Sequence, residues 1–332
     1  MPARTVRIEI GVNGAFLTRR WEEPDNWMRL TAELGYPLHS FCADVLDPFF
    51  SGDRSYQLEA AAATRAAAER YGVRLFDFYT GVATHRFHGL SHRDERVRAR
   101  MREWIVQALD LCAAMGIPRL GGHWDAFSVE VLASERETEQ AWQRVIEQFR
   151  CLAEAARARG LVALYNEQMY IPSEVPWTLD QAERFLIEAN DGRTGVPVRL
   201  TLDVGHQAGM HYGLGGPDLD YREWLRRFGA FTEIVHLQQT TPDASHHWPF
   251  TAAYNERGHV RIDAVLEALR WSFAHADESP VARVLSPVSE VALIAEIIPG
   301  STKTEAALLA ELRETADYLR QFVPAGGLEW EV

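Results

Sequence analysis

The stretch Val106–Trp124, VQALDLCAAMGIPRLGGHW, contains the unit from which the fold can be deduced. Apolar residues recur at roughly helical intervals between Val106 and Met115, and Gly116 follows them as a helix C-cap glycine should. The next run, Arg119–Trp124, is short and largely apolar, as a buried strand is. The stretch therefore predicts a helix, a tight connection and a strand.

The same alternation runs through the whole chain. Short apolar, β-branched runs predict eight strands, at Val6–Asn13, Pro37–Ala43, Arg74–Thr80, Arg119–Trp124, Val162–Gln168, Val198–Val204, Glu233–Gln239 and Val291–Ile298. Amphipathic runs predict a helix after each strand, beginning near Pro24, Ser55, Arg93, Glu135, Leu179, Tyr221, Ile262 and Thr302. Helix boundaries are marked by glycines before the next strand and by one N-cap threonine, namely Gly72, Gly116, Gly160 and Thr178.

Eight strand–helix units favour a parallel sheet, and eight is the number that closes a (β/α)8 TIM barrel. The competing architecture is a doubly wound open sheet, which often has a glycine-rich first turn. Here the first turn, Asn13–Ala15, carries no phosphate-binding glycine motif. No linker rich in Pro, Gly or Ser divides the chain, so residues 1–332 are predicted to form a single TIM-barrel domain. The long connection 240–260 is rich in His and aromatic residues, which indicates a functional loop.

Composition restricts the partners. The net charge of −13 at pH 7, without a basic run, disfavours nucleic acid. The three cysteines form no CxxC pair, which fits a reducing compartment. The N-terminus has no apolar signal stretch, and no run approaches the ~18 apolar residues of a membrane span, so a cytoplasmic location is expected. A homo-oligomer is compatible with the sequence, which does not show a pairing face.

Polar residues end the later strands, where the active site of a TIM barrel lies. They are His123, Glu167, Asp203 with His206, His236 and Glu296. Three buried carboxylates at neighbouring strand ends would be costly and would repel one another, and one bound cation would relieve both problems. Mixed oxygen and nitrogen ligands suit Mn²⁺, Co²⁺, Mg²⁺ or Zn²⁺.

Each of these residues also has a structural explanation when taken alone. Glu167 could cap a loop, and Asp203 could be an N-cap for the following turn. His236 could be a hydrogen-bonded core histidine, and Glu296 could pair with an arginine. Because all four fall on strands five to eight, a shared site for one divalent metal ion is the favoured interpretation.

The last four predicted strands carry the motifs Asn-Glu167, Leu-Asp203-Val-Gly-His206, Val-His236-Leu and Ala-Glu296. In this order and spacing they resemble the xylose isomerase-like TIM-barrel superfamily, from Gly11 to about Phe322. That superfamily holds sugar phosphate isomerases and epimerases, ketose 3-epimerases and endonuclease-four-type AP endonucleases. Further stretches, including Ala43-Asp44-Val-Leu-Asp47-Pro48 and His247-Trp248-Pro249-Phe250, are similar to tetrulose-phosphate isomerases and epimerases of erythritol catabolism.

The resemblance implies that Glu167, Asp203, His236 and Glu296 are the metal ligands, with Mn²⁺ the first expectation. It also implies that Glu167 and Glu296 transfer the proton, and that His206 contacts the substrate or the metal. There are departures: ketose 3-epimerases place a substrate-binding arginine six residues after the strand-seven histidine, where this chain has Pro242. A second substrate glutamate is also one position late, at Glu174, so the substrate is expected to differ from a free ketohexose.

The expected chemistry is proton abstraction next to a carbonyl of a small sugar or sugar phosphate, through a metal-stabilised enediolate. Residues expected to contact the substrate or cover the site are His123, His206, His246, His247, Trp248 and Trp21. His246, His247, Trp248 and Trp21 could instead be surface or packing residues, and His123 could be a core histidine. Two other functions remain open. One is a metal-dependent lyase or decarboxylase acting on a 3-oxo sugar or C-glycoside, and the other, disfavoured by the charge, is an AP endonuclease-like enzyme.

Overall fold

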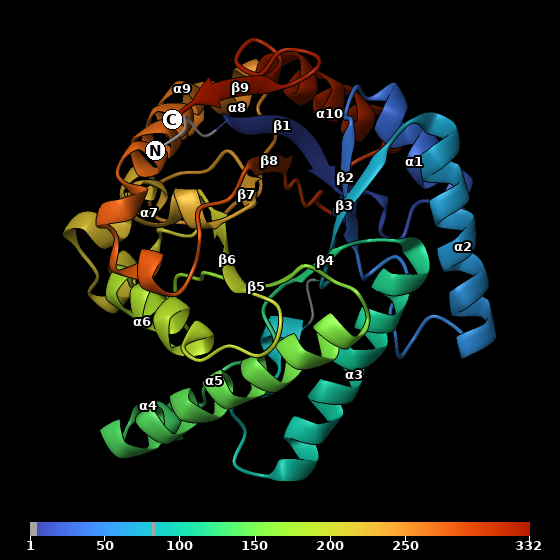
Figure 1. Cartoon of the computed structure of the whole chain (residues 1–332). Coiled ribbons are helices and arrows are strands. Elements are labelled where there is room, and N and C mark those ends of the chain that lie inside the picture. The colour runs from blue at the N-terminus through green and yellow to red at the C-terminus, as the bar shows by residue number, and fades with distance from the viewer. Residues whose placement is uncertain (1–4, 82–83) are drawn as a thin grey trace.

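The computed structural model describes residues 5–81 and 84–332, and it shows a closed barrel of eight parallel strands (Figure 1). Neighbouring strands follow the order β2-β3-β4-β5-β6-β7-β8-β1, and β1 pairs with β2 to close the ring. The strands are β1 (Thr5–Asn13), β2 (Leu38–Cys42), β3 (Arg74–Tyr79), β4 (Arg119–Gly121), β5 (Ala163–Glu167), β6 (Val198–Asp203), β7 (Ile234–Leu237) and β8 (Glu290–Ala295). The predicted TIM barrel is therefore confirmed.

Helices surround the barrel, one long helix following each strand (Figure 1). They are α1 (Pro24–Glu33), α2 (Arg54–Tyr71), α3 (Glu95–Met115), α5 (Glu135–Ala158), α6 (Leu179–Asn190), α7 (Tyr221–Phe228), α9 (Ile262–Ala274) and α10 (Glu305–Leu319). Each begins within three residues of its predicted start. None of the helices in residues 5–81 and 84–332 combines the length and apolarity that a membrane crossing requires.

Short elements lie in the connections, where periodicity is too brief to be recognised in a sequence. They are α4 (Val129–Leu132), α8 (Ala252–Arg257) and the 3₁₀ turns η1 (Gly14–Leu17), η2 (Thr84–Arg86), η3 (Gly209–Tyr212), η4 (Gly216–Leu219), η5 (Gly229–Phe231), η6 (Ala276–Glu278) and η7 (Pro280–Arg283). A final strand, β9 (Leu328–Glu331), was also not predicted; it pairs antiparallel with the first half of β1.

The predicted helix boundaries have the expected chemistry. Gly72 and Gly116 adopt left-handed conformations, with φ of 66° and 74°, directly after α2 and α3. Thr178 accepts a hydrogen bond from the backbone N–H of Gln181 at the start of α6. The two glycine caps end α2 and α3 close to the next strand and so keep the connections at the base of the barrel short, whereas Thr178 starts α6 at the opposite end.

Strands β4 and β8 each end three residues earlier than predicted, because the chain leaves the ladder where it enters the site. The predicted strand Arg119–Trp124 ends at Gly121, and the predicted strand Val291–Ile298 ends at Ala295. Gly122 follows with a φ of 142°, and a Cβ there would lie 1.7 Å from the hydroxyl of Thr80. Only glycine allows this close passage, which carries the chain on to His123.

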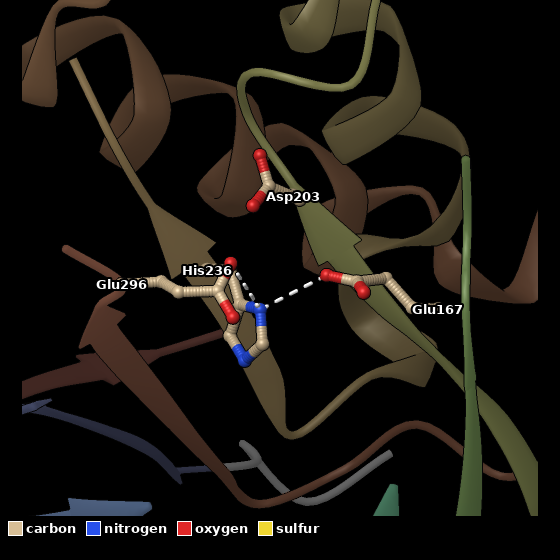
Figure 2. Close-up of side chains that lie close together, drawn as sticks. All are labelled: Glu167, Asp203, His236 and Glu296. Atoms are coloured by element: carbon tan, nitrogen blue, oxygen red, sulfur yellow. Dashed lines mark hydrogen bonds and ion pairs between the residues drawn. The ribbon is translucent and has the colours of Figure 1, made fainter. Parts of the chain in front are cut away.

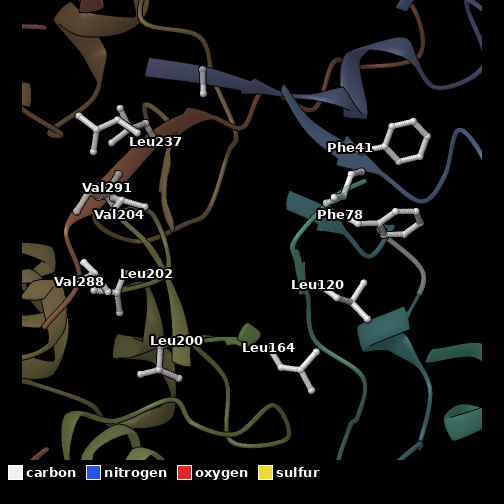
Figure 3. Close-up of a cluster of buried hydrophobic side chains, with 14 of the residues drawn as sticks. Phe41, Phe78, Leu120, Leu164, Leu200, Leu202, Val204, Leu237, Val288 and Val291 are labelled. Atoms are coloured by element: carbon white, nitrogen blue, oxygen red, sulfur yellow. The ribbon is translucent and has the colours of Figure 1, made fainter. Parts of the chain in front are cut away.

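Apolar side chains fill the space between the barrel and its helices. Figure 3 shows part of this layer around the barrel, including Leu120, Leu164 and Leu200. A smaller apolar cluster that includes Tyr165, Ile234 and Ile294 fills the lower interior of the barrel. The upper interior, toward the carboxyl ends of the strands, is instead lined with polar residues.

Candidate metal centre

Four side chains from neighbouring strands converge at the carboxyl ends of the barrel strands. Glu167 ends β5, Asp203 ends β6, His236 lies on β7, and Glu296 directly follows β8. Each offers a ligand atom, and these atoms all lie within 4.8 Å of one another. All four residues are buried, and Figure 2 shows their polar ends turned toward a common point.

The charges in this cluster are not balanced by a permanent cation. No arginine or lysine of the described residues forms an ion pair with any of its three carboxylates. The imidazole of His236 takes that place, with Nδ1 3.0 Å from Oε1 of Glu167 and 3.3 Å from Oε2 of Glu296 (Figure 2). Burial alone would lower the pKa of His236, but the two glutamates outweigh burial and raise this pKa well above its ordinary value.

Burial and the neighbouring charges also have opposite effects on Glu296. Burial raises the pKa of Glu296, but the charges of His236 and His247 outweigh it and hold the pKa well below the ordinary value. Oε2 of Glu296 is buried and makes no hydrogen bond to a described residue. A buried cluster of three carboxylates and one imidazole fits a divalent cation that accepts oxygen and nitrogen ligands.

Asp203 is held in place by the chain around it. Its Oδ1 accepts hydrogen bonds from the backbone N–H of Gly205 at 2.6 Å and from Nε2 of Gln238 at 2.9 Å. Position 205 must be glycine for this contact, because a Cβ there would lie 2.3 Å from the side-chain carbonyl carbon of Gln238. The Asp-Val-Gly sequence thus fixes the direction of the carboxylate.

Backbone carbonyls fix the tautomers of two histidines. Nδ1 of His206 lies 2.9 Å from the carbonyl oxygen of Gln168, and Nδ1 of His123 lies 3.2 Å from that of Glu167. Because a carbonyl only accepts, each Nδ1 carries a hydrogen, and in a neutral ring Nε2 is then left as an acceptor. Burial lowers the pKa of His123 to about 4, so its ring is neutral, and its Nε2 has no partner among the described residues.

The connection between β7 and α9 brings His247 to the cluster. His247 has a left-handed backbone, with a φ of 51°, and its Nδ1 lies 3.3 Å from Oε2 of Glu296. Its backbone N–H donates to Oε1 of Gln238 at 2.7 Å. Gln238 therefore joins the loop to Asp203, and the strained residue is one that reaches the site.

A cavity of about 260 Å³ opens above the cluster. Its polar lining includes Asn13, Tyr79, His85, Arg86, His123, Glu167, Tyr170, His206, His247 and Glu296. The predicted site residues His123, His206 and His247 therefore share one cavity with two of the proposed metal ligands. A volume of this size suits a small polar molecule such as a short sugar.

Three predicted substrate contacts lie outside this lining. Trp21 packs edge-on against Phe16 and lines a separate depression. His246 stacks on Trp248 with ring centroids 3.9 Å apart. The guanidinium of Arg257 lies 4.5 Å from the ring centroid of Trp248. The two aromatic residues of the loop therefore stabilise its conformation rather than face the cavity.

Sequence reasoning missed several residues of the cavity. Asn13 ends β1; its Oδ1 accepts from the N–H of Ala15 and its Nδ2 is buried without a partner among the described residues. Tyr79 ends β3, and its ring lies 4.5 Å from that of His236. Both are polar residues at strand ends, so the signal used for strands four to eight was also present on strands one and three.

Comparison with known proteins finds a family that this chain matches. A family model described as "Xylose isomerase-like TIM barrel" matches residues 28–272. The chain is 24% identical over 265 residues to a D-erythrulose 1-phosphate 3-epimerase from Brucella abortus (strain 2308), a match that covers 79% of this chain and 83% of that protein.

Solved structures show the same fold at low sequence identity. A provisionally named xylose isomerase from Rhodospirillum rubrum superposes with a TM-score of 0.80 at 23% identity, covering 95% of this chain and 99% of the other. D-allulose 3-epimerase from a Methylomonas species, in complex with D-allulose, gives a TM-score of 0.64 at 17% identity, covering 95% and 97%.

Proposed function

The chain belongs to the xylose isomerase-like TIM-barrel family, and we propose that it is a divalent-metal-dependent isomerase or epimerase of a small ketose or ketose phosphate. The observation that supports this most strongly is the buried cluster of three carboxylates and one histidine without a permanent cation. The similarity to a tetrulose-phosphate epimerase supports the same reaction class. The acidic chain, with a net charge of −13, favours small molecules over nucleic acid.

Glu167, Asp203, His236 and Glu296 would hold the cation, for which Mn²⁺ is the first candidate. A divalent cation bound there would supply Lewis-acid stabilisation of the negative charge that develops on the substrate oxygens when a proton leaves. The ligand set also admits Co²⁺, Mg²⁺ or Zn²⁺. The absence of cysteine from the cluster sets it apart from thiolate-rich structural zinc sites.

The two glutamates would move the proton. They come from β5 and from the end of β8, with β6 and β7 between them, so they approach the cavity from different directions. One carboxylate would take a proton from the carbon next to the carbonyl, and the other would return one. Return to the opposite face of the same carbon gives epimerisation, and return to the neighbouring carbon gives isomerisation.

Uncharged polar groups would orient the substrate. Nε2 of His123 can accept a hydrogen bond from a hydroxyl, and Nδ2 of Asn13 can donate one. His206 lies beside Glu167 and Asp203, at 4.0 Å from a carboxylate oxygen of each, and would contact a substrate oxygen close to the reacting carbon. Such contacts contribute to the rate by fixing the reacting atoms in position.

Solvent deuterium exchange tests this proposal. The metal-loaded protein would be incubated in D₂O with C4 to C6 ketoses and their phosphates, and deuterium would be located by NMR. We expect deuterium on a carbon next to the carbonyl with wild type, and none with Glu167→Gln. Cleavage of the substrate without exchange would instead identify the lyase or decarboxylase activity, and no reaction with any ketose would contradict the proposal.

A further inference from the structure

One arginine faces the cavity without an anionic partner. Arg86, at the end of η2, is the sole arginine or lysine among the described residues of the cavity lining. Within residues 5–81 and 84–332 it forms neither a hydrogen bond nor an ion pair. Most arginines on the described helices and at the barrel base are paired with a carboxylate, as Arg119 is with Glu233. A free guanidinium in a cavity of an acidic protein therefore calls for an explanation.

Two other arginines could have gripped an anionic substrate, and the structure separates them from the cavity. Arg19 has a left-handed backbone, with a φ of 63°, and lines the separate depression that contains Trp21. Arg257 lies over the rings of Trp248 and Tyr254, at 4.5 and 5.7 Å from their centroids. Of the three, Arg86 alone lines the cavity that contains the two catalytic glutamates.

The surroundings of Arg86 favour an anion over a neutral hydroxyl. His85 lines the same cavity beside it and likewise makes no hydrogen bond to a described residue, so two nitrogen-bearing side chains are available. Arg86 also acts on Glu174, but burial raises the pKa of that carboxyl to about 7, so Glu174 supplies only a partial negative charge at neutral pH. Arg86 is exposed to solvent, unlike the buried metal cluster, so a strongly hydrated group bound there need not be fully desolvated.

We infer that Arg86, assisted by His85, forms an anion subsite that binds the phosphate of a ketose phosphate while the ketose end reaches the metal cluster. This inference rests on the proposed function and narrows its substrate class to phosphorylated sugars. The planar guanidinium can donate two parallel hydrogen bonds to phosphate oxygens. The subsite also accounts for the missing arginine at Pro242, because the cationic contact would come from the loop after β3 instead of the loop after β7.

Anion binding provides the first test. Inorganic phosphate would be titrated into the metal-loaded protein, with binding followed by calorimetry and by the shift in melting temperature. We expect Arg86→Gln to weaken phosphate binding about 10- to 100-fold, the usual loss for a charge-assisted contact, and Arg86→Lys to retain part of it. Arg19→Gln, the matched control from the neighbouring depression, should bind phosphate as wild type does. Equal binding by wild type and Arg86→Gln, or no binding by wild type, would overturn the inference, and equal preference for acetate would replace phosphate by a carboxylate.

Kinetics provide the second test and separate the two proposals. For a ketose phosphate, Arg86→Gln should raise KM about 10- to 100-fold with little change in kcat, and for the corresponding free ketose it should change neither. An equal loss on both substrates would assign Arg86 a structural role and overturn the inference. If phosphate binds through Arg86 but no ketose phosphate exchanges deuterium, the subsite stands and the proposed function fails.

Discussion

The two ends of the barrel both bury charged side chains, but they balance them differently. At the base, where the strands begin, Arg119 donates to Glu233 at 2.7 Å and to Glu290 at 2.6 Å. Arg74 adds a second cation to Glu290 at 2.8 Å, and Tyr165 donates to Glu233. At the mouth, where the strands end, the carboxylates of Glu167, Asp203 and Glu296 form no ion pair with an arginine or lysine of the described residues.

This difference indicates which end of the barrel balances its charges with the chain's own residues. Carboxylates removed from water are costly unless they are paired, and the base pairs the partly buried Glu233 and Glu290 with Arg119. At the mouth, the only ion-pairing partners of the three carboxylates among the described residues are the imidazoles of His206, His236 and His247. A network that stabilises the fold needs nothing further, whereas a cluster with an excess of negative charge is suited to a cation from solution. The base is therefore interpreted as structural and the mouth as catalytic, as in other TIM barrels.

The largest effect is expected at the mouth. Glu296→Gln removes one ligand charge and one proton-transfer group, so kcat should fall by about 10²- to 10⁴-fold, while the protein stays folded. Steady-state kinetics on the ketose found by deuterium exchange would measure this. The matched substitution at the base, Glu233→Gln, should leave kcat within about twofold of wild type, since it lies at the N-terminal face, away from the chemistry. Equal losses in the two variants would remove the distinction between the ends.

The second effect is expected at the base. Arg119→Met leaves Glu233 and Glu290 partly uncompensated, so the free energy of unfolding should fall by about 3 kcal/mol. The loss should lie at the low end for buried pairs because Arg74 still contacts Glu290. Urea unfolding would measure it, and Arg119→Lys should lose less. A normal stability with reduced metal content would contradict the assignment of Arg119 to the structural end.

The third-largest effect is expected at a buried histidine that belongs neither to the ion pairs at the base nor to the carboxylate cluster at the mouth. His39 lies on β2, its Nδ1 is hydrogen-bonded to the hydroxyl of Thr31 on α1 at 2.9 Å, and burial lowers its pKa to about 3. The unfolded chain therefore binds this proton first, so the free energy of unfolding should fall as pH drops below 6.5, by about 2 kcal/mol between pH 6.5 and 5. His39→Asn should flatten this slope in chemical denaturation measured across pH. An unchanged slope would show that His39 is accessible to protons in the folded protein.

The smallest effect is expected at Gln238, which positions Asp203 and His247 at the mouth. Gln238 contacts both Asp203 and the N–H of His247, so Gln238→Leu should weaken metal affinity about 10-fold, as loss of a contact behind a ligand does. The next residue supplies the control: Gln239 bonds Asn255 and the carbonyl of Val260, away from the cluster. Gln239→Leu should lower stability and leave metal affinity unchanged. Chelator competition would measure both, and equal affinities in the two variants would rule out a positioning role for Gln238.

The sequence was sufficient for the architecture because its signals are local. Periodicity, cap glycines and short apolar runs each depend on a few neighbouring residues, and they located eight strands and eight helices. Signals that depend on tertiary contacts were not visible. The early end of β4 follows from the close passage of Gly122 along Thr80, and β9 depends on pairing with β1.

The candidate site was predictable in part for the same reason. Glu167, Asp203, His236 and Glu296 could be grouped because parallel strands bring their carboxyl ends to one edge. The loop 240–260 could not be oriented from sequence, so His246, His247 and Trp248 were treated alike. In the structure a left-handed backbone turns His247 into the cavity, while stacking turns the other two away from it. That Arg86 lines the cavity, whereas Arg19 and Arg257 do not, follows from the tertiary structure alone.

The most direct test of this account is metal content. Wild type, Glu296→Gln and Glu233→Gln would be dialysed against Mn²⁺, freed of loose ions by gel filtration, and examined by elemental analysis. The account predicts about one equivalent per chain in wild type and in Glu233→Gln, and a large loss in Glu296→Gln, as expected when one of four ligands is removed. No metal in wild type, or equal metal in the two glutamate variants, would mean that the mouth is a polar network like the base.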